Sequence, residues 1–448
     1  MTDENVCIDE DIFAKSLCMM FSLEWLRETA RRTGFIKRER KITPEIFFWV
    51  LVLGYGPFLQ RTLAGMKRMY EKAIKQTISD SSWYYRFTPE LVAFLHECVI
   101  HGMKQLAKES CRSLDAHLNC FLDVLIQDST IIRLNKVLAD KWPAARSKTV
   151  AAEVKVSVLV SARANGPKSV SIIPERTSDI KTLRIGSWIR DRIILVDLGF
   201  YKYGIYSKIQ NICGYFVSRM KSNANPVILG LNKGCKLDKR RIKGKKLAEI
   251  INGLNGEILD AKIEIKYYKK GKAGRGELIL EEFRLVAIYN IEDEKYHVSI
   301  NSISNELLTA KDIANLYKGR WEIELIFKEL KSKYQLDVVE TTNEQVIEAF
   351  IWISILTMIV SREIYNIIRM LNPDKQIARF TQMRWCNVFV ESSPDFLREV
   401  LCYLGINDSD IIKTKFEVYG SQALDPHVNR ERFRGQFMGL TDDQWAPF

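Results

Sequence analysis

The segment FLDVLIQDST, residues 121–130, and the segment RIILVDLGFY, residues 192–201, each lead an apolar run into an aspartate, Asp128 or Asp197. Short apolar runs of this kind, bounded by polar or glycine-containing segments, predict buried β-strands. Ligand crevices in α/β folds form at the carboxyl ends of strands, where an aspartate is held rigidly at the edge of the sheet. One aspartate in this place is usually a turn or cap residue, but two of them indicate a shared site.

Further strand-like runs surround these two segments. They lie at 154–160, 170–173 and 215–217, and the residues 180–190 and 201–212 have a helical pattern. Mixed strands and helices in this order predict a three-layer α/β domain. The sequence therefore places both aspartates in one α/β core.

The N-terminal part of the chain, from about residue 9 to 110, has helical periodicity. Thr43-Pro44-Glu45 is typical of a helix start, and the residues 54–57, Gly-Tyr-Gly-Pro, break that helix before a further helical stretch over about 59–78. Six bases fall within eleven residues of this part: Arg31, Arg32, Lys37, Arg38, Arg40 and Lys41. Such a cluster suits the phosphates of DNA, although a solvated turn explains it equally well.

Residues 225–305 are basic and rich in strand-like runs. Eight of the fourteen residues from 233 to 246 are Lys or Arg, and the runs follow at 261–268, 277–289 and 296–300. We expect a basic segment of this kind to contact nucleic acid. Beyond it, long helical patterns return over about 310–333 and 343–371, and a shorter helical set ends near residue 406.

Composition limits the partners and the compartment. The 448 residues hold 67 Lys and Arg against 55 Asp and Glu, so 67 − 55 gives a formal net charge of +12. This excess favours an acidic partner, nucleic acid before an anionic membrane, although a basic protein without a polyanionic ligand stays open. The nine cysteines form no C-x-x-C pair, which argues against a disulfide framework and a zinc ribbon and favours a reducing compartment. The five histidines lack i, i+4 spacing, which argues against a zinc site with histidine ligands.

Length and hydropathy add two further limits. A chain of 448 residues exceeds the size of a single hydrophobic core, so it predicts two to four structural units. The most apolar run, 346–360, contains Glu348 and is too short to span a bilayer, and the N-terminus is acidic, unlike a secretory signal. We expect a buried helix at 346–360 and no membrane partner.

Four chemically active side chains share one border of the helix predicted over 310–333. They are Tyr317, Arg320, Glu324 and Lys331, which fall within about 60° of one another at 100° per residue. The apolar stripe beside them consists of Leu316, Ile323, Ile326, Phe327 and Leu330. A side chain at this border can be fixed by the core and still reach a ligand, although a solvated Glu/Lys face is the alternative.

Asp128, Asp197 and Glu324 can together hold a pair of Mg²⁺ ions, because hard divalent cations prefer oxygen ligands. Two such ions stabilise both the attacking and the leaving oxygen of an in-line phosphoryl displacement. Nearby Arg and Lys side chains would neutralise the flanking phosphates. The residues therefore predict a metal-dependent nuclease or strand-transfer enzyme acting on DNA.

The spacing Tyr317-x2-Arg320-x3-Glu324-x6-Lys331 resembles the Tyr-Arg-Glu-Lys signature of the insertion-sequence-four family of DDE transposases. Trp321 and the pair Phe327-Lys328 strengthen the resemblance. The DST at Asp128 and the DLGFY at Asp197 look like the first and second aspartate motifs of the family. The 324 − 197 = 127 residues from Asp197 to Glu324 leave room for the long β-rich insertion of that family.

The resemblance implies an α/β multidomain protein whose ribonuclease H-like catalytic core is interrupted by a β-strand insertion domain and flanked by helical N-terminal and C-terminal regions. The implied boundaries are 1–118 for a helical DNA-binding region, 119–224 and 306–372 for the two parts of the core, 225–305 for the insertion and 373–448 for the C-terminal region.

The resemblance also implies cut-and-paste transposition with Mg²⁺ or Mn²⁺, two ions per site. A water cleaves one strand at the transposon end, the freed 3′-OH forms a hairpin with the opposite strand, a second water opens it, and the 3′-OH then attacks target DNA. The implied partners are the double-stranded transposon ends, target DNA and a second copy of the chain in a synaptic homodimer, in the cytoplasm.

The implied residue roles follow the motifs. Asp128, Asp197 and Glu324 are metal ligands and catalytic. Tyr317, Arg320 and Lys331 contact phosphates, and Trp321 supports the distorted DNA end.

Further DNA contacts are expected from weaker matches. Tyr296, in YHVSINS, stands where the family places an aromatic side chain that stacks on a flipped base, although a core tyrosine explains it equally well. Arg219 and Lys221, in FVSRMKSNA, resemble a DNA-contacting segment, with a solvated strand end as the alternative. The basic run of the insertion adds Arg240, Arg241 and Lys243 as DNA contacts.

Two other functions stay open from the sequence. A decayed or domesticated transposase would bind DNA without cutting it, although the three acids and the signature are all present. A stand-alone repair or restriction nuclease would cut DNA without a hairpin product.

Overall fold

The computed structural model describes most of the chain. The described residues are 11–38, 41–54, 62–74, 76–109, 114, 116–145, 150–270, 276–372 and 380–406. Arg40, the predicted helix break beyond Gly54 and the predicted C-terminal region after residue 406 lie outside them.

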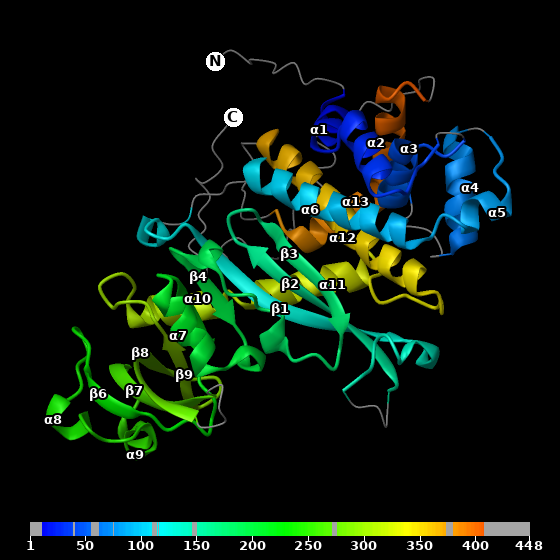
Figure 1. Cartoon of the computed structure of the whole chain (residues 1–448). Coiled ribbons are helices and arrows are strands. Elements are labelled where there is room, and N and C mark those ends of the chain that lie inside the picture. The colour runs from blue at the N-terminus through cyan, green and yellow to red at the C-terminus, as the bar shows by residue number, and fades with distance from the viewer. Residues whose placement is uncertain are drawn as a thin grey trace, which may run out of the picture.

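One mixed sheet of nine strands runs through the described part of the chain (Figure 1). Its strands are β1 (Asp123–Leu134), β2 (Ala152–Ser161), β3 (Gly166–Pro174), β4 (Arg192–Val196), β5 (Tyr215–Arg219), β6 (Val227–Leu231), β7 (Leu259–Lys270), β8 (Gly276–Asn290) and β9 (Lys295–Asn301). The order is β3-β2-β1-β4-β5-β9-β8-β7-β6. The pairs β1–β4 and β4–β5 are parallel, and the other pairs are antiparallel.

Helices from both ends of the chain form one layer against β1–β3 (Figure 1). The N-terminal ones are α1 (Ile12–Met20), α2 (Leu23–Arg32), α3 (Pro44–Trp49), α4 (Leu63–Ile74), α5 (Asp80–Tyr84) and α6 (Pro89–Glu109), and a π-helical turn, Val50–Gly54, follows α3. The later ones are α12 (Glu344–Met370) and α13 (Gln382–Tyr403). The sequence therefore predicted correctly that both ends are helical, as far as they are described.

Alternation along the strands divides the core between the two faces of the sheet, because successive side chains point to opposite sides. Val124 and Ile126 of β1 face the helical layer, whereas Leu125 faces a second core that includes α7 (Tyr203–Asn211). The second core continues under β6–β9, where α8 (Lys239–Ile242) and α9 (Leu247–Ile250) lie. Both faces of the central strands are thus covered by apolar side chains.

The predicted strands and helices are largely confirmed, with two corrections. Residues 180–190 do not form a helix but two short 3₁₀ turns, Asp179–Lys181 and Ser187–Ile189, because Gly186 between them is fully extended. β1 does not end at Asp128 but continues to Leu134, since β2 pairs with it as far as Ala152. Asp128 therefore lies inside a strand, not at its end.

The predicted β-rich insertion continues the sheet of the core. β9 pairs with β5 from Val217–Asn301 to Arg219–Ser299, so β6–β9 join the sheet of the core through β5, the neighbour of β4. The basic run 233–246 lies at the far end of this sheet, on and around α8. In the N-terminal region, Arg32 pairs with Glu97 and Lys41 donates to the carbonyl of Thr77, 3.0 Å away.

α12 is the one described helix that is long and apolar enough to cross a bilayer on those two criteria, and 83% of its most apolar window is buried inside the protein. The burial is that of a core helix, as the sequence predicted.

The helix that carries Glu324, α11 (Trp321–Ser332), is fixed to α12 by a buried ion pair. Glu329 of α11 pairs with Arg362 of α12, and their side chains are 1% and 0% exposed. Breaking such a pair leaves an uncompensated charge in the core.

We therefore expect Glu329→Gln to lower the free energy of unfolding by about 3–5 kcal/mol. Urea unfolding measures this loss. The neighbouring exposed Lys328→Gln is the control and should stay within about 0.5 kcal/mol of the natural protein. Equal stability of the two variants would show that the pair does not anchor α11.

Candidate active site

Strand register brings the two predicted aspartates together. The parallel pairing of β1 with β4 runs from Asp123–Arg192 to Gln127–Val196, and the next residues in the same register are Asp128 and Asp197. The pairing of β4 with β5 ends at Val196–Ser218, so the same row continues to Arg219. Paired residues of neighbouring strands share a face, and this face is the one on which α11 packs against β1.

The predicted helix over 310–333 is two helices, α10 (Ala310–Lys318) and α11, joined at Gly319 and Arg320. At the junction the amide of Arg320 donates to the carbonyl of Tyr317 at 3.1 Å, and that of Glu322 donates to Gly319 at 3.1 Å. These three-residue bonds tighten the chain locally, and glycine is a weak helix former. The apolar stripe is buried as predicted, and Arg320 stands at the start of α11.

Arg320 connects two of the predicted carboxylates. Its Nη1 lies 3.3 Å from Oδ2 of Asp128, and its Nη2 lies 2.6 Å from Oε1 of Glu324. The three side chains are 17%, 21% and 36% exposed, so the guanidinium is mostly enclosed between the two acids. Residues separated by 192 positions thus meet in one ion-pair network.

The site is electrostatically strained around Asp128. Burial raises the pKa of Asp128 to about 6, and the negative charges of Asp197 and Glu324 act in the same direction. The amide of Ser129, 2.8 Å from Oδ1, and the charge of Arg320 oppose this shift. The three acids therefore repel one another, which is the environment that attracts a cation.

The pKa values of Arg320 and Tyr317 are also shifted in this cluster. Burial works against the charge of Arg320, but its hydrogen bond to Glu324 and the charges around it leave its pKa raised. Burial raises the pKa of Tyr317, and Asp197 adds to the rise. Tyr317 is thus a neutral hydrogen-bonding group beside Asp197 at physiological pH.

A groove of about 880 Å³ opens beside the cluster. Its lining includes Asp197, Arg219, Tyr317, Arg320 and Trp321, from β4, β5 and the α10–α11 segment. Trp321 is 52% exposed, which is unusual for an indole and leaves its ring available to a ligand. This groove joins an acidic cluster, two arginines and an exposed aromatic ring.

Two further predicted site residues are not part of the groove lining and contact the protein. Lys331 donates from Nζ to the carbonyl of Ile131 in β1 at 3.1 Å. Lys221 places Nζ 5.3 Å from the ring centre of Tyr201.

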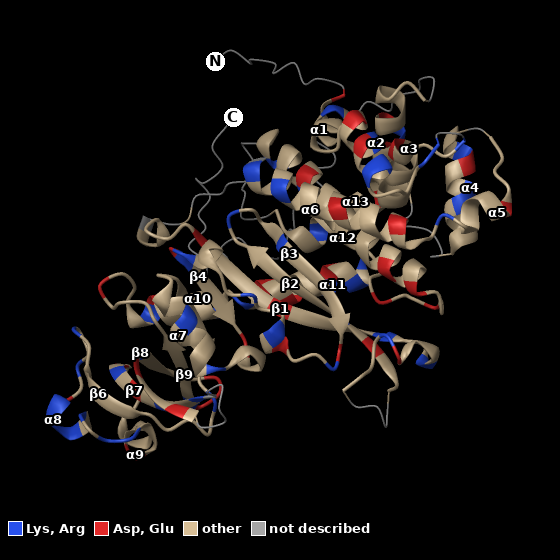
Figure 2. Ribbon diagram, in the orientation of Figure 1, with Lys and Arg blue, Asp and Glu red and all other residues tan. Residues whose placement is uncertain are grey.

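Four other predicted residues lie away from the acids. Tyr296 packs with the second core, on the opposite face of the sheet, and its hydroxyl accepts from the amide of Gly256 at 2.8 Å. Arg240, Arg241 and Lys243 lie on or directly after α8, at the end of the sheet (Figure 2). The structure does not bring these four residues to the carboxylates.

Sequence reasoning missed a second polar cluster under the site. Asp179 accepts from Ser129 Oγ at 2.9 Å and pairs with Lys155 Nζ at 2.9 Å. Lys155 is 7% exposed at its side chain, inside β2. A β-carbon at Gly199 would lie 3.0 Å from Oδ2 of Asp179, so a larger residue there would press on this carboxylate. No local pattern reveals this cluster, because only the β1–β2 pairing brings Lys155 near Ser129.

Comparison with known proteins places the chain among transposases. A sequence model of the family described as "Transposase DDE domain" matches residues 119–360. The chain belongs to the DDE transposase family. The matched region contains Asp128, Asp197 and Glu324, and the membership confirms the family resemblance read from the sequence.

Curated relatives carry transposase names. The chain is 21% identical over 378 residues to the transposase for insertion sequence element IS1151 of Clostridium perfringens, covering 78% of this chain and 80% of that protein. It is 24% identical over 387 residues to the transposase for IS231B of Bacillus thuringiensis subsp. berliner, covering 78% and 79%. The transposase for IS231E of Bacillus thuringiensis subsp. finitimus is 20% identical over 372 residues, covering 76% and 77%.

A DDE transposase domain implies a divalent metal ion, and the carboxylate side chains of this transposase suit such an ion. Two aspartates and a glutamate offer the oxygen ligands that Mg²⁺ and Mn²⁺ prefer. Within the described residues, no three Asp, Glu, His or Cys side chains are grouped as they would be around one ion. The positive charge between Asp128 and Glu324 is that of Arg320, so the guanidinium and a cation would compete for the same carboxylates.

We expect Arg320→Ala to bind Mn²⁺ about 3–10-fold more tightly than the natural protein, because the variant removes a competing positive charge from the acids. Titration with Mn²⁺ followed by electron paramagnetic resonance measures the free ion. Lys311→Ala is the matched control, since Lys311 lines the same groove and its loss should leave the affinity unchanged. Weaker Mn²⁺ binding by Arg320→Ala would contradict the competition.

Proposed function

We propose that this DDE transposase binds the terminal inverted repeats of its own mobile element, cleaves the DNA at each end and joins the freed 3′-OH to target DNA. The observation that carries the proposal is the ion-pair network of Arg320 with Asp128 and Glu324, beside Asp197. Structural ion pairs seldom concentrate three mutually repelling acids at the edge of an open groove, whereas phosphoryl-transfer sites require them.

A ribonuclease H-like core is part of the proposal. It is supported by the strand order β3-β2-β1-β4-β5, in which β1, β4 and β5 are parallel and β2 and β3 form an antiparallel hairpin beside them. The segment 225–305 then serves as the insertion between Asp197 and Glu324. Its strands extend the same sheet, so the insertion and the core would move as one body.

Each side chain of the site has a proposed role in strand cleavage. Asp128, Asp197 and Glu324 would hold two Mg²⁺ or Mn²⁺ ions, which when bound supply charge stabilisation at the scissile phosphate. A water oxygen attacks phosphorus and loses a proton, and the bond to the 3′ oxygen breaks, so that this oxygen takes up a proton and leaves as the 3′-OH. Tyr317 donates a hydrogen bond to a phosphate oxygen and keeps its proton. Arg320 and Lys331 neutralise the flanking phosphates once Arg320 has left its carboxylates.

The exposed aromatic ring of the groove would stabilise the distorted DNA end. Hairpin formation requires the terminal bases to leave the helix, and an indole offers a stacking surface for an unpaired base. We assign this support to Trp321, which lines the groove and is half-exposed. The stacking role expected of Tyr296 stays a prediction without structural support, because the hydroxyl of Tyr296 is bound to the 256–257 loop.

The remaining proposed DNA contacts are basic side chains. Arg219 lines the groove beside Asp197, and Lys221 follows it after β5. Arg240, Arg241 and Lys243 would hold the DNA further along the insertion, and a synaptic homodimer in the cytoplasm would bring two ends together. The basic residues at α8 thus lie apart from the carboxylates that must attract a metal ion.

We expect Asp128→Asn, Asp197→Asn and Glu324→Gln each to slow cleavage of a duplex carrying the inverted repeat that flanks the gene by more than about 100-fold, because each removes a negative charge that stabilises the transition state through the metal. The affinity for the duplex should stay within about threefold. Gel analysis of nicked and hairpin products measures the cleavage rate, and fluorescence anisotropy measures the affinity for the duplex.

The exposed Asp140→Asn is the control and should cleave normally. An inactive wild-type protein that still binds the repeat would mean a decayed transposase. Cleavage without any hairpin product would favour the stand-alone nuclease. A variant that cleaves at the natural rate would remove its residue from the site.

We expect the triple change Arg240→Gln, Arg241→Gln and Lys243→Gln to reduce the slope of log affinity against log salt concentration by about 2–3, because each phosphate contact contributes about 0.9. Anisotropy between 50 and 300 mM KCl would measure the slope, with Lys136→Gln and Arg398→Gln as the control. An unchanged slope would place the DNA grip elsewhere.

A further inference from the structure

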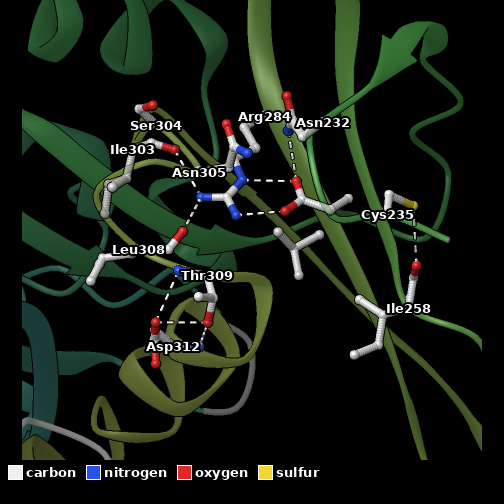
Figure 3. Close-up of polar contacts among 12 residues, drawn as sticks. Asn232, Cys235, Ile258, Arg284, Ile303, Ser304, Asn305, Leu308, Thr309 and Asp312 are labelled. Carbon is white, nitrogen blue, oxygen red and sulfur yellow. Dashed lines mark hydrogen bonds and ion pairs between the residues drawn. The ribbon is translucent and has the colours of Figure 1, made fainter. Parts of the chain in front are cut away.

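A buried arginine outside the carboxylate site connects the strands of the insertion to the start of α10, the helix that carries Tyr317. Arg284 of β8 is 6% exposed and forms a double hydrogen bond with Asp260 of β7, at 2.9 Å from Nε and 2.7 Å from Nη2. Its Nη1 donates to two carbonyls, Ile303 at 3.0 Å and Leu308 at 2.8 Å. Figure 3 shows the guanidinium between the strands and this loop.

The two carbonyls mark the two ends of the connection between β9 and α10. Ile303 follows β9 by two residues, and Leu308 directly precedes Thr309, the N-cap of α10. Thr309 and Asp312 form a capping box, with the amide of Thr309 donating to Asp312 at 2.9 Å and the amide of Asp312 donating to Thr309 at 3.3 Å (Figure 3). One guanidinium group therefore fixes where the helix with Tyr317 begins.

Asp260 is itself held in place. Asn232, which directly follows β6, donates from Nδ2 to Oδ1 of Asp260 at 2.7 Å, and its backbone amide donates to the carbonyl of Asp260 at 3.0 Å. A buried ion pair offsets its desolvation only when its remaining polar groups are also bonded. Here both carboxylate oxygens and three guanidinium nitrogens have partners.

Resting on the proposed function, we propose that Arg284 is a positioning residue of the cleavage reaction. It transmits the position of the insertion strands to α10 and, through the tight Gly319 turn, to Arg320 and Glu324. It touches no DNA itself. The insertion would then contribute to the rate of cleavage as well as to DNA binding, because the glutamate reaches the aspartates only when the 303–308 loop is held.

The first test compares Arg284→Gln with the natural full-length protein. We expect single-turnover cleavage of the inverted-repeat duplex with Mg²⁺ to slow about 10–100-fold, since small misplacements of catalytic groups have effects of that size. Binding of the same duplex should stay within about threefold. Arg284→Lys should not restore the rate, because an ammonium cannot hold Asp260 and two carbonyls in a planar fork. Natural cleavage rates in both variants would overturn the proposal.

A second variant separates positioning from folding. The double change Asp260→Leu with Arg284→Met replaces the pair by apolar side chains, so no unpaired charge is left in the core. We expect this protein to unfold at a higher temperature than Arg284→Gln, which leaves Asp260 charged and unpaired, and yet to cleave as slowly, since the bonds to Ile303 and Leu308 are gone. A fast double variant would overturn the proposal. Arg398→Gln, from a surface ion pair with Asp395 on α13, is the control and should cleave normally.

A third measurement needs no catalysis. Amide hydrogen exchange in Arg284→Gln should accelerate at least tenfold over 303–318 and stay unchanged in β1 and β4. Unchanged exchange at 303–318 would overturn the role of Arg284 even in an active transposase. The natural protein could fail to cleave the repeat duplex while Arg284→Gln still shows faster exchange at 303–318. That outcome would overturn the proposed function and, with it, the catalytic part of this inference.

Discussion

The parallel pairing of β1 with β4 is the interaction on which the rest of the site depends. It sets Asp128 and Asp197 side by side on one face of the sheet, although 69 residues separate them in the chain. A slip of one residue would turn every side chain of β1 to the other face. Apolar side chains from both cores pack on both faces of these strands, so the register is fixed. The free energy of this packing offsets the repulsion between the two acids.

The third acid reaches this row from a helix that is anchored at both ends. The pair of Glu329 with Arg362 holds α11 against the core helix α12, and the bonds of Arg284 hold the loop before α10. The tight turn at Gly319 between these anchors sets the position of Arg320. A rigid support on each side is what a site needs when its acids repel one another.

The net charge of +12 is distributed in a way that suits DNA transposition. Basic residues cluster at α8, at the far end of the sheet (Figure 2), whereas Asp128 and Glu324 lie beside Arg320. Phosphate contacts give affinity and register, whereas the acids must stay free of permanent cationic partners to take up a metal. Arg320 pairs with two of the acids in this structure, and in the proposed mechanism its guanidinium would pair with phosphate instead. The relatives, at 20–24% identity, are all named as insertion-sequence transposases.

The amino-acid sequence by itself predicted most strands and helices and the family, and it gave Asp128, Asp197 and Glu324 as candidate ligands. Apolar runs of the right length predict β1 and β4, and the spacing from Tyr317 to Lys331 gives the resemblance to the signature, because both are local patterns. It misplaced the end of β1 and missed the break at Gly319, since a strand end depends on its partner strand and a tight helix turn on local hydrogen bonds. Only the tertiary structure decided that Arg320 bridges Asp128 and Glu324, that Tyr296 packs on the opposite face of the sheet, and that Arg284 pairs with Asp260 and Asp179 with Lys155. Each of these depends on residues far apart in the chain that meet through strand pairing and packing, which no local pattern encodes.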